Sequence, residues 1–193
     1  HRKFGTTGFL PTLISDELSV VAAAIAAANE ALAAGVPGLL GIHLEGPFLN
    51  PVKNGAHDAS KFRALDDAAF EVLTKLETGK TMVTIAPEMT EPKMIRRLVD
   101  AGVVVSAGHT NATYDEIRAA IDAGLSGFTH LFNAMSPLTS REPGVVGAAL
   151  EDENTWSGMI VDGYHVSPVT MRIATAAKSL DRFLLVTDAM PSV

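Results

Sequence analysis

The sequence predicts an α/β fold in which parallel strands form a (β/α)8 barrel of the TIM type. Short apolar runs alternate with helical patterns along the chain, which favours a parallel sheet with helices packed outside it. The runs are continuous rather than alternating, as expected for strands buried on both faces. Polar side chains gather where the runs end, and in a (β/α)8 barrel that face carries the active site. An open doubly wound sheet is the alternative architecture.

Seven runs have the length and composition of strands, and turn-forming or polar residues bound each of them. They cover residues 8–13, 39–46, 81–87, 103–110, 127–133, 157–166 and 183–189. A complete (β/α)8 barrel needs a further strand and usually has about 250 residues, whereas this chain has 193. We therefore expect at least one strand, the first, to be missing from this chain.

Helix signals lie between these runs, where a capping residue starts each helix and a glycine or a lysine lies near its end. The expected helices start at Ser15, at Asp66 or Asp67, at Thr90, at Asn111 or Thr113, and at Ser167, and they end at Gly35, near Gly79, at Gly102, at Gly124 and near Lys178. No linker divides the chain, so we expect residues 1–193 to form one catalytic barrel domain.

The composition restricts the partners and the kind of metal site. The chain is 47% hydrophobic and 19% charged with a formal net charge of -7, which argues against nucleic acid or an anionic membrane as partner. No apolar run reaches the roughly 18 residues of a membrane helix. Because cysteine is absent, a metal site must use histidine and carboxylates. No signal peptide is visible, and we expect a cytoplasmic protein, although the lack of cysteine fits either side of a membrane.

Four residues that can bind a metal stand at or near the ends of different predicted strands: Glu45, His109, His130 and Asp188. Imidazole and carboxylate together suit zinc, iron or a similar divalent ion, and three protein ligands leave a coordination position open for water. Asp188 follows an apolar run and is a candidate to accept a proton from that water. Each residue alone is better explained as a hydrogen-bonded structural residue or a cap, but their recurrence at one end of one sheet favours a metal hydrolase.

Three further residues are candidates with open alternatives. Arg141 lies in a loop after a strand, and its guanidinium matches phosphate in a two-pronged geometry, but the pattern alone favours an ion pair with Glu142 or another surface acid. His57 follows a loop rich in proline and glycine, and it either lies at the surface or contacts substrate. His43 precedes Glu45 by two positions on the same side of the strand, so it either supports Glu45 or lines the barrel interior.

Seven segments occur together in an order and spacing that resembles one enzyme family. They are HLEGPFLNP (43–51), IAPEM (85–89), VVSAGHTNAT (104–113), THLFNAM (129–135), REPG (141–144), DGYHV (162–166) and LVTDAM (185–190). This set, which is far more specific than any single motif, resembles the N-acetylglucosamine-6-phosphate deacetylases of the amidohydrolase superfamily along essentially the whole chain.

The resemblance implies a metal-dependent (β/α) barrel that converts N-acetyl-D-glucosamine 6-phosphate to D-glucosamine 6-phosphate and acetate, in amino sugar catabolism and cell-wall sugar recycling. By this resemblance Glu45, His109 and His130 would hold the metal. We expect zinc, with iron, cobalt and nickel as alternatives. Asp188 would act as the general base and then as the acid that protonates the leaving amine. His165 would polarise the acetyl carbonyl and stabilise the oxyanion.

The same resemblance implies how a phosphosugar substrate would be held. Ala56 and His57 would line the sugar, and Asn133 and Ala134 would contact the phosphate. Arg141 would also hold the phosphate, by reaching into the neighbouring subunit of a homodimer.

Two features of the family lie outside this sequence. The family carries a metal-associated motif, often His-x-His, on its first barrel strand, and no such motif precedes residues 5–12 (GTTGFLPT). It also has a small β-domain built from both termini. We therefore expect an internal portion of the enzyme, truncated at both ends, with about seven βα units and without the first strand and the small β-domain. The alternatives are another amidohydrolase that acts on a cyclic amide or an N-acyl substrate, or a catalytically inactive fragment.

Overall fold

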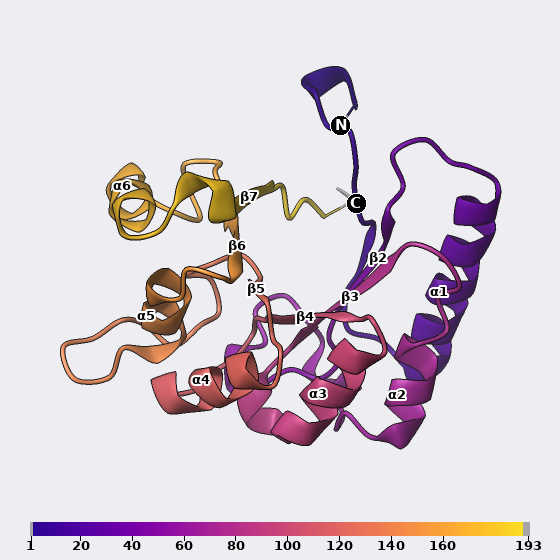
Figure 1. The fold of residues 1–193 in the computed structure, drawn as a ribbon, viewed down its shortest axis with the longest axis horizontal. Coiled ribbons are helices and arrows are strands. Elements are labelled where there is room, and N and C mark those ends of the chain that lie inside the picture. The colour runs from indigo at the N-terminus through magenta and orange to yellow at the C-terminus, as the bar shows by residue number, and fades with distance from the viewer. Residues whose placement is uncertain (1, 191–193) are drawn as a thin grey trace.

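The computed structural model describes residues 2–190 and contains a parallel sheet of seven strands that follow one another in chain order. The strands are β1 (Thr12–Leu13), β2 (Gly41–Glu45), β3 (Lys80–Ile85), β4 (Val104–Ala107), β5 (Gly127–Phe128), β6 (Trp156–Ile160) and β7 (Phe183–Val186). Figure 1 shows that the sheet curls, with helices along its outer side. The unbroken strand order and the curl confirm the barrel and exclude the doubly wound sheet, in which the strand order reverses.

Helices connect successive strands from β1 onward, as right-handed crossovers in a parallel sheet require. The α-helices of residues 2–190 are α1 (Leu18–Ala33), α2 (Asp67–Leu73), α3 (Pro92–Asp100), α4 (Tyr114–Asp122), α5 (Gly144–Glu151) and α6 (Pro168–Ala177). Short 3₁₀ helices are η1 (Arg2–Phe4), η2 (Pro51–Lys53), η3 (Ala59–Lys61), η4 (Pro87–Met89) and η5 (Leu180–Arg182).

Helix capping follows the sequence at three of the five expected starts and departs from it at two. The side chains of Asp66, Thr113 and Ser167 accept hydrogen bonds from backbone N–H groups in the first turns of α2, α4 and α6, which satisfies donors that the helix leaves unpaired. Helix α1 starts after Glu17 instead of Ser15, so the expected cap at Ser15 is wrong. Helix α3 starts after Glu91, without a side-chain cap, so the expected start at Thr90 is also wrong. The hydroxyl of Ser15 has other partners, which lie in the candidate site.

Four other elements differ from expectation. Helix α5 was not predicted, because Gly144 and Gly147 are poor helix formers, yet residues 144–150 are all buried. Close packing therefore outweighs propensity there. Helix α2 ends at Leu73 instead of near Gly79, and β1 and β5 are only two residues long.

The sheet separates an apolar layer from a polar barrel interior. On the outer face, Leu44 lies in register with Val83, and both are fully buried against the helical layer. On the inner face, Glu45 lies in register with Thr84. Because side chains alternate along a strand, His43 shares the inner face with Glu45. This alternation directs the polar residues of β2 towards the centre of the barrel.

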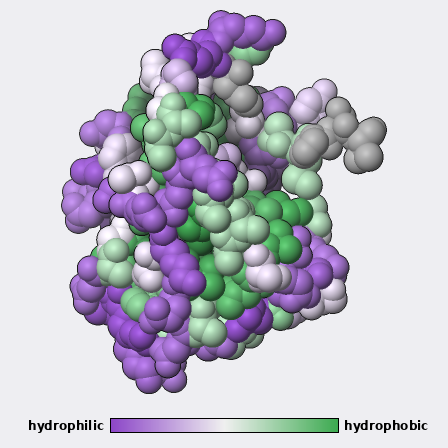
Figure 2. Space-filling view, turned by 90° about the vertical axis from the view of Figure 1, so that its right-hand side faces the viewer, coloured by the Kyte–Doolittle hydropathy of each residue, from purple (hydrophilic) through white to green (hydrophobic). Residues whose placement is uncertain are grey.

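Helix α1 shows how the outer layer packs. Val21, Ile25 and Ala28 are its buried residues, and their spacing places them on one side of the helix. The side of the molecule that carries α1 has a mixed surface, with an apolar area among hydrophilic side chains (Figure 2). In the part of the chain that the structure describes, no helix is long and apolar enough to cross a membrane.

Candidate metal centre and active site

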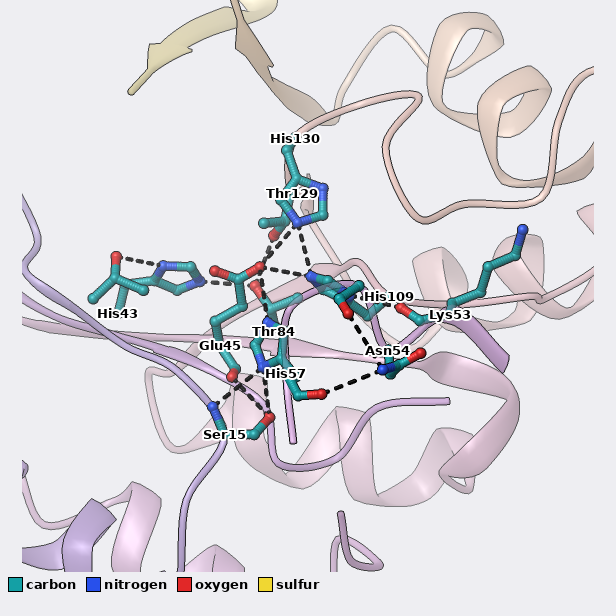
Figure 3. A network of polar contacts seen from close by, with 12 residues as sticks. Ser15, His43, Glu45, Lys53, Asn54, His57, Thr84, His109, Thr129 and His130 are labelled. Carbon is teal, nitrogen blue, oxygen red and sulfur yellow. Dashed lines mark hydrogen bonds and ion pairs between the residues drawn. The ribbon is translucent and has the colours of Figure 1, made fainter. Parts of the chain in front are cut away.

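Three of the predicted residues converge at the carboxyl ends of the strands. Glu45 is the last residue of β2, His109 follows β4 and His130 follows β5, and all three are buried. Oε1 of Glu45 lies 3.0 Å from Nε2 of His109 and 2.9 Å from Nε2 of His130. The two Nε2 atoms lie 3.0 Å apart. One carboxylate oxygen and two imidazole nitrogens therefore point at one another (Figure 3).

The protonation of His109 suits this cluster to a cation. Its Nδ1 lies 2.7 Å from the carbonyl oxygen of Lys53, which can only accept, so in neutral His109 the proton is on Nδ1 and Nε2 is bare. That bare nitrogen faces Nε2 of His130 and a carboxylate oxygen. In a tetrahedral site with metal–ligand distances of about 2.0–2.1 Å, ligand atoms lie about 3.3 Å apart. The observed separations of the three ligand atoms are close to that ligand–ligand distance, so these three residues fit a divalent ion.

Charge inside the cluster has one dominant source. Burial by itself raises the pKa of the Glu45 carboxyl, but contacts with His109, His130 and His57 outweigh it and hold the pKa far below its ordinary value. Burial lowers the pKa of His130, whereas the hydrogen bond and charge of Glu45 and the charge of Asp188 raise it above its ordinary value. A buried carboxylate that stays ionised is a strong ligand for a cation.

Backbone strain concentrates in the loops that carry the candidate residues. His109, His130, Ala134 and Asp188 have φ values of 48°, 36°, 50° and 49°, and Phe132 has 80°. These are the non-glycine residues of the described chain with positive φ. Left-handed backbone costs about 1–2 kcal/mol per non-glycine residue, and such strain gathers at functional sites.

His57 is buried beside the cluster and does not lie at the surface. Its ring lies 4.3 Å from that of His109, and its Nε2 lies 3.7 Å from Oε1 of Glu45. Ala56, its neighbour, is exposed. His43 lies deeper, where its ring nitrogens contact Thr12 at 3.0 Å and Thr84 at 2.7 Å, so it lines the barrel interior.

Asp188 and His165 make no hydrogen bond to the cluster among the described residues. Asp188 is exposed after β7, and its charge is felt at His43 and His130. His165 is exposed, with Nδ1 2.7 Å from a carboxylate oxygen of Asp162.

The residues expected at the phosphate lie on the segment after β5. The side-chain amide of Asn133 donates to the carbonyl oxygen of His130, and the carbonyl of Ala134 accepts from the N–H of Thr110. Arg141 is exposed in the loop before α5, and that loop projects from the body of the molecule (Figure 1).

Comparison with known proteins decides the family. Residues 2–188 match the family model described as the amidohydrolase family. The chain belongs to the amidohydrolase family. Membership in this family implies a divalent metal, and Glu45, His109 and His130 form the candidate site for it.

The amidohydrolase relatives include enzymes named as sugar-phosphate deacetylases. An N-acetylgalactosamine-6-phosphate deacetylase of Shewanella sp. (strain ANA-3) is 47% identical over 190 residues, covering 98% of this chain and 48% of that protein. The crystal structure of N-acetyl-D-glucosamine-6-phosphate deacetylase from Mycobacterium smegmatis has 43% identity and a TM-score of 0.90, covering 96% of this chain and 49% of that one. The Pasteurella multocida N-acetylglucosamine-6-phosphate deacetylase has 38% identity and a TM-score of 0.91, with the same coverage. The chain spans about half the length of the curated relatives it matches.

Sequence reasoning missed two groups that position the histidines of this amidohydrolase site. One is the carbonyl oxygen of Lys53, which is invisible to side-chain patterns. The other is Ser15, which contacts His57 across 42 positions of sequence. The signal that could have pointed to a close approach is Gly46, because a glycine directly after a strand-end ligand often admits a neighbouring group.

Proposed function

We propose that the complete protein is a metal-dependent hydrolase that removes acetate from N-acetyl-D-glucosamine 6-phosphate. The observation that carries the proposal is the buried convergence of Glu45, His109 and His130 at the carboxyl ends of the strands. Relatives named as deacetylases of N-acetylhexosamine 6-phosphates, matched over at least 96% of this chain, support the substrate class. Such a protein acts on a small cytoplasmic metabolite, and we propose the cytoplasm as its location.

In the proposed reaction, Glu45, His109 and His130 hold the divalent ion, for which zinc is the first candidate and iron, cobalt and nickel are alternatives. The ion supplies a Lewis acid that polarises a carbonyl and acidifies water. Asp188 takes the proton of the attacking water and returns it to the leaving amine.

His165 donates to the developing oxyanion through Nε2. The contact of its Nδ1 with Asp162 supports this role, because a carboxylate on one ring nitrogen orients the other. Ala56 and His57 line the sugar, and Asn133 and Ala134 contact the phosphate.

Arg141 binds the phosphate of the neighbouring subunit in the proposed homodimer. The exposed position of Arg141 in a projecting loop supports this role. Mixed dimers test it: Arg141→Ala and Asp188→Asn variants, each inactive alone, should regain activity when their subunits are exchanged, because one hybrid site then has both residues intact. No recovery in verified mixed dimers would contradict an arginine supplied by the partner.

Acetate release by the complete, metal-loaded protein is the direct test of the activity. We expect release from N-acetyl-D-glucosamine 6-phosphate, its loss after chelation, and its near abolition by Asp188→Asn with metal content retained. Equal kcat/KM for the phosphorylated and the free sugar would remove the role of Arg141. Hydrolysis of cyclic amides or other N-acyl compounds in place of the sugar phosphate would favour a different amidohydrolase activity.

The galactose epimer is a second candidate substrate, favoured by the 47% identity to a protein named N-acetylgalactosamine-6-phosphate deacetylase. The two substrates differ only in the configuration at C4 of the sugar. The ratio of their kcat/KM values, measured in the same assay, decides between them.

A further inference from the structure

Ser15 makes contacts that its position in a loop does not explain. It lies between β1 and α1 and is buried. Its backbone nitrogen lies 3.2 Å and its Oγ 2.8 Å from Nδ1 of His57. The same Oγ lies 3.3 Å from the carbonyl oxygen of Glu45. One serine therefore contacts both His57 and the end of the strand that carries Glu45, as Figure 3 shows.

These contacts determine the tautomer of His57. A backbone N–H can only donate, so Nδ1 of His57 presents its lone pair to Ser15. The hydroxyl has one proton and lies nearer to this lone pair, at 2.8 Å, than to the carbonyl oxygen of Glu45, at 3.3 Å, so it donates to Nδ1 as the second and shorter contact. A neutral imidazole with a bare Nδ1 carries its proton on Nε2. The Nε2–H group faces Oε1 of Glu45 at 3.7 Å, which is too long for a hydrogen bond. The donor is thus free to bind a closer acceptor.

The neighbouring imidazole is held in the opposite tautomer. Nδ1 of His109 donates to the carbonyl oxygen of Lys53 at 2.7 Å, which leaves Nε2 bare. The two rings lie 4.3 Å apart in an edge arrangement. Two adjacent histidines therefore face Glu45 with different chemistry: His109 offers a lone pair and His57 offers a proton.

Gly46 makes the approach of Ser15 sterically feasible. Its φ is +86°, and a Cβ added there would lie 2.1 Å from Oγ of Ser15 and 2.9 Å from a side-chain carbon of Leu49. Any side chain at this position would displace the serine hydroxyl. The residue after the metal-facing carboxylate thus keeps space open for the group that orients His57.

We propose that Ser15 is a positioning residue that holds His57 as an Nε2–H donor, so that His57 binds an oxygen of the substrate and is not a further metal ligand. The identity of the acceptor rests on the proposed function, whereas the tautomer and the absence of a metal bond do not.

Nitrogen NMR of the complete, zinc-loaded protein tests the tautomer directly. The protein is labelled with ¹⁵N-histidine and measured at about pH 8.5, and the measurement is repeated at a higher pH to verify that the signals report neutral imidazoles. The signals of His57 are those that disappear in His57→Gln. We expect a bare Nδ1 and a protonated Nε2 for His57, and the reverse protonation for His109. A protonated Nδ1 on His57 would overturn the proposal.

Variants of the complete protein separate the positioning role from metal binding. In Ser15→Ala we expect the two His57 nitrogen signals to move towards each other as the second tautomer becomes populated, and kcat/KM to fall about 2- to 10-fold, as for one lost hydrogen bond. Zinc content after dialysis should stay at the wild-type level in Ser15→Ala and His57→Gln and fall in His109→Gln, the matched control.

Two results would refute the proposal here: loss of zinc in His57→Gln to the same extent as in His109→Gln, or His57 signals that Ser15→Ala leaves unchanged. If the complete protein releases no acetate, the proposed function fails, while the NMR and zinc measurements still decide this inference.

Discussion

Replacing Gly46 by alanine tests whether the space beside Ser15 is required. The substitution forces an L-residue into a backbone with φ +86° and places its Cβ 2.1 Å from Oγ of Ser15. Gly102 provides a matched control, because its φ is +85° and a Cβ there would meet nothing within 4 Å. Gly102→Ala therefore carries the backbone strain without the collision.

The two substitutions separate two energies. The left-handed backbone costs an alanine about 1–2 kcal/mol, and we expect Gly102→Ala to lose that much free energy of unfolding. Overpacking in a tight interior costs about 1–3 kcal/mol more, so Gly46→Ala should lose about 2–5 kcal/mol. Because Oγ is the atom that collides first, adding Ser15→Ala to Gly46→Ala should recover part of the loss.

Urea denaturation of the complete protein, followed by circular dichroism, measures these differences as shifts of the midpoint at constant slope. The reasoning would be refuted if Gly46→Ala and Gly102→Ala were equally stable. It would also fail if the effects of Ser15→Ala and Gly46→Ala simply added, since the collision requires them to be coupled.

Three further perturbations address the metal centre and the distant ion pair. Glu45→Gln should weaken metal binding by at least about 100-fold, measured as zinc content after dialysis, while Glu153→Gln on the exposed surface should leave it unchanged. Chelation should lower Tm by about 5–15 °C because a ligand that binds only the folded state stabilises it, and a chelator without effect on Tm would argue against a bound ion. Burial by itself raises the pKa of Asp152, but the hydrogen bonds from Arg118 and from backbone N–H groups outweigh burial and hold the pKa below its ordinary value of 3.8. The ion pair therefore stabilises the fold above that pH, and the stabilisation is lost as the pH falls below it. Asp152→Asn should lower Tm at pH 5 and reduce the further fall of Tm between pH 5 and 3. An unchanged dependence of Tm on acid pH would show that the ion pair does not contribute.

The barrel and the three converging residues were predictable because their signals are local. Each apolar run that ends in Glu45, His109 or His130 predicts both a buried strand and a polar group at the carboxyl end of that strand. Parallel pairing then brings these ends together whatever the intervening sequence. Composition and short-range pattern were sufficient for this part of the molecule.

The rest depends on contacts that no local pattern encodes. Ser15 has the sequence context of a helix cap, but the helix starts later and the hydroxyl contacts His57. The tautomer of His109 depends on a backbone carbonyl. Helix α5 forms against its glycines because tertiary packing buries it. The roles of Asp188 and His165 stay predictions, since both side chains are exposed and, among the described residues, neither makes a hydrogen bond to the cluster.

The three converging residues are far apart along the chain, with 64 positions between Glu45 and His109 and 21 between His109 and His130. An ion that binds all three would close two loops at once, as cross-links do. Closing loops of this length costs an open chain several kcal/mol of conformational entropy, a cost that the folded barrel has already met when it presents the three residues to the ion. In a sequence without cysteine, such an ion would be the cross-link that ties β2, β4 and β5 together. The supply of metal in the cell would then set how long the folded protein lasts as well as how fast it works.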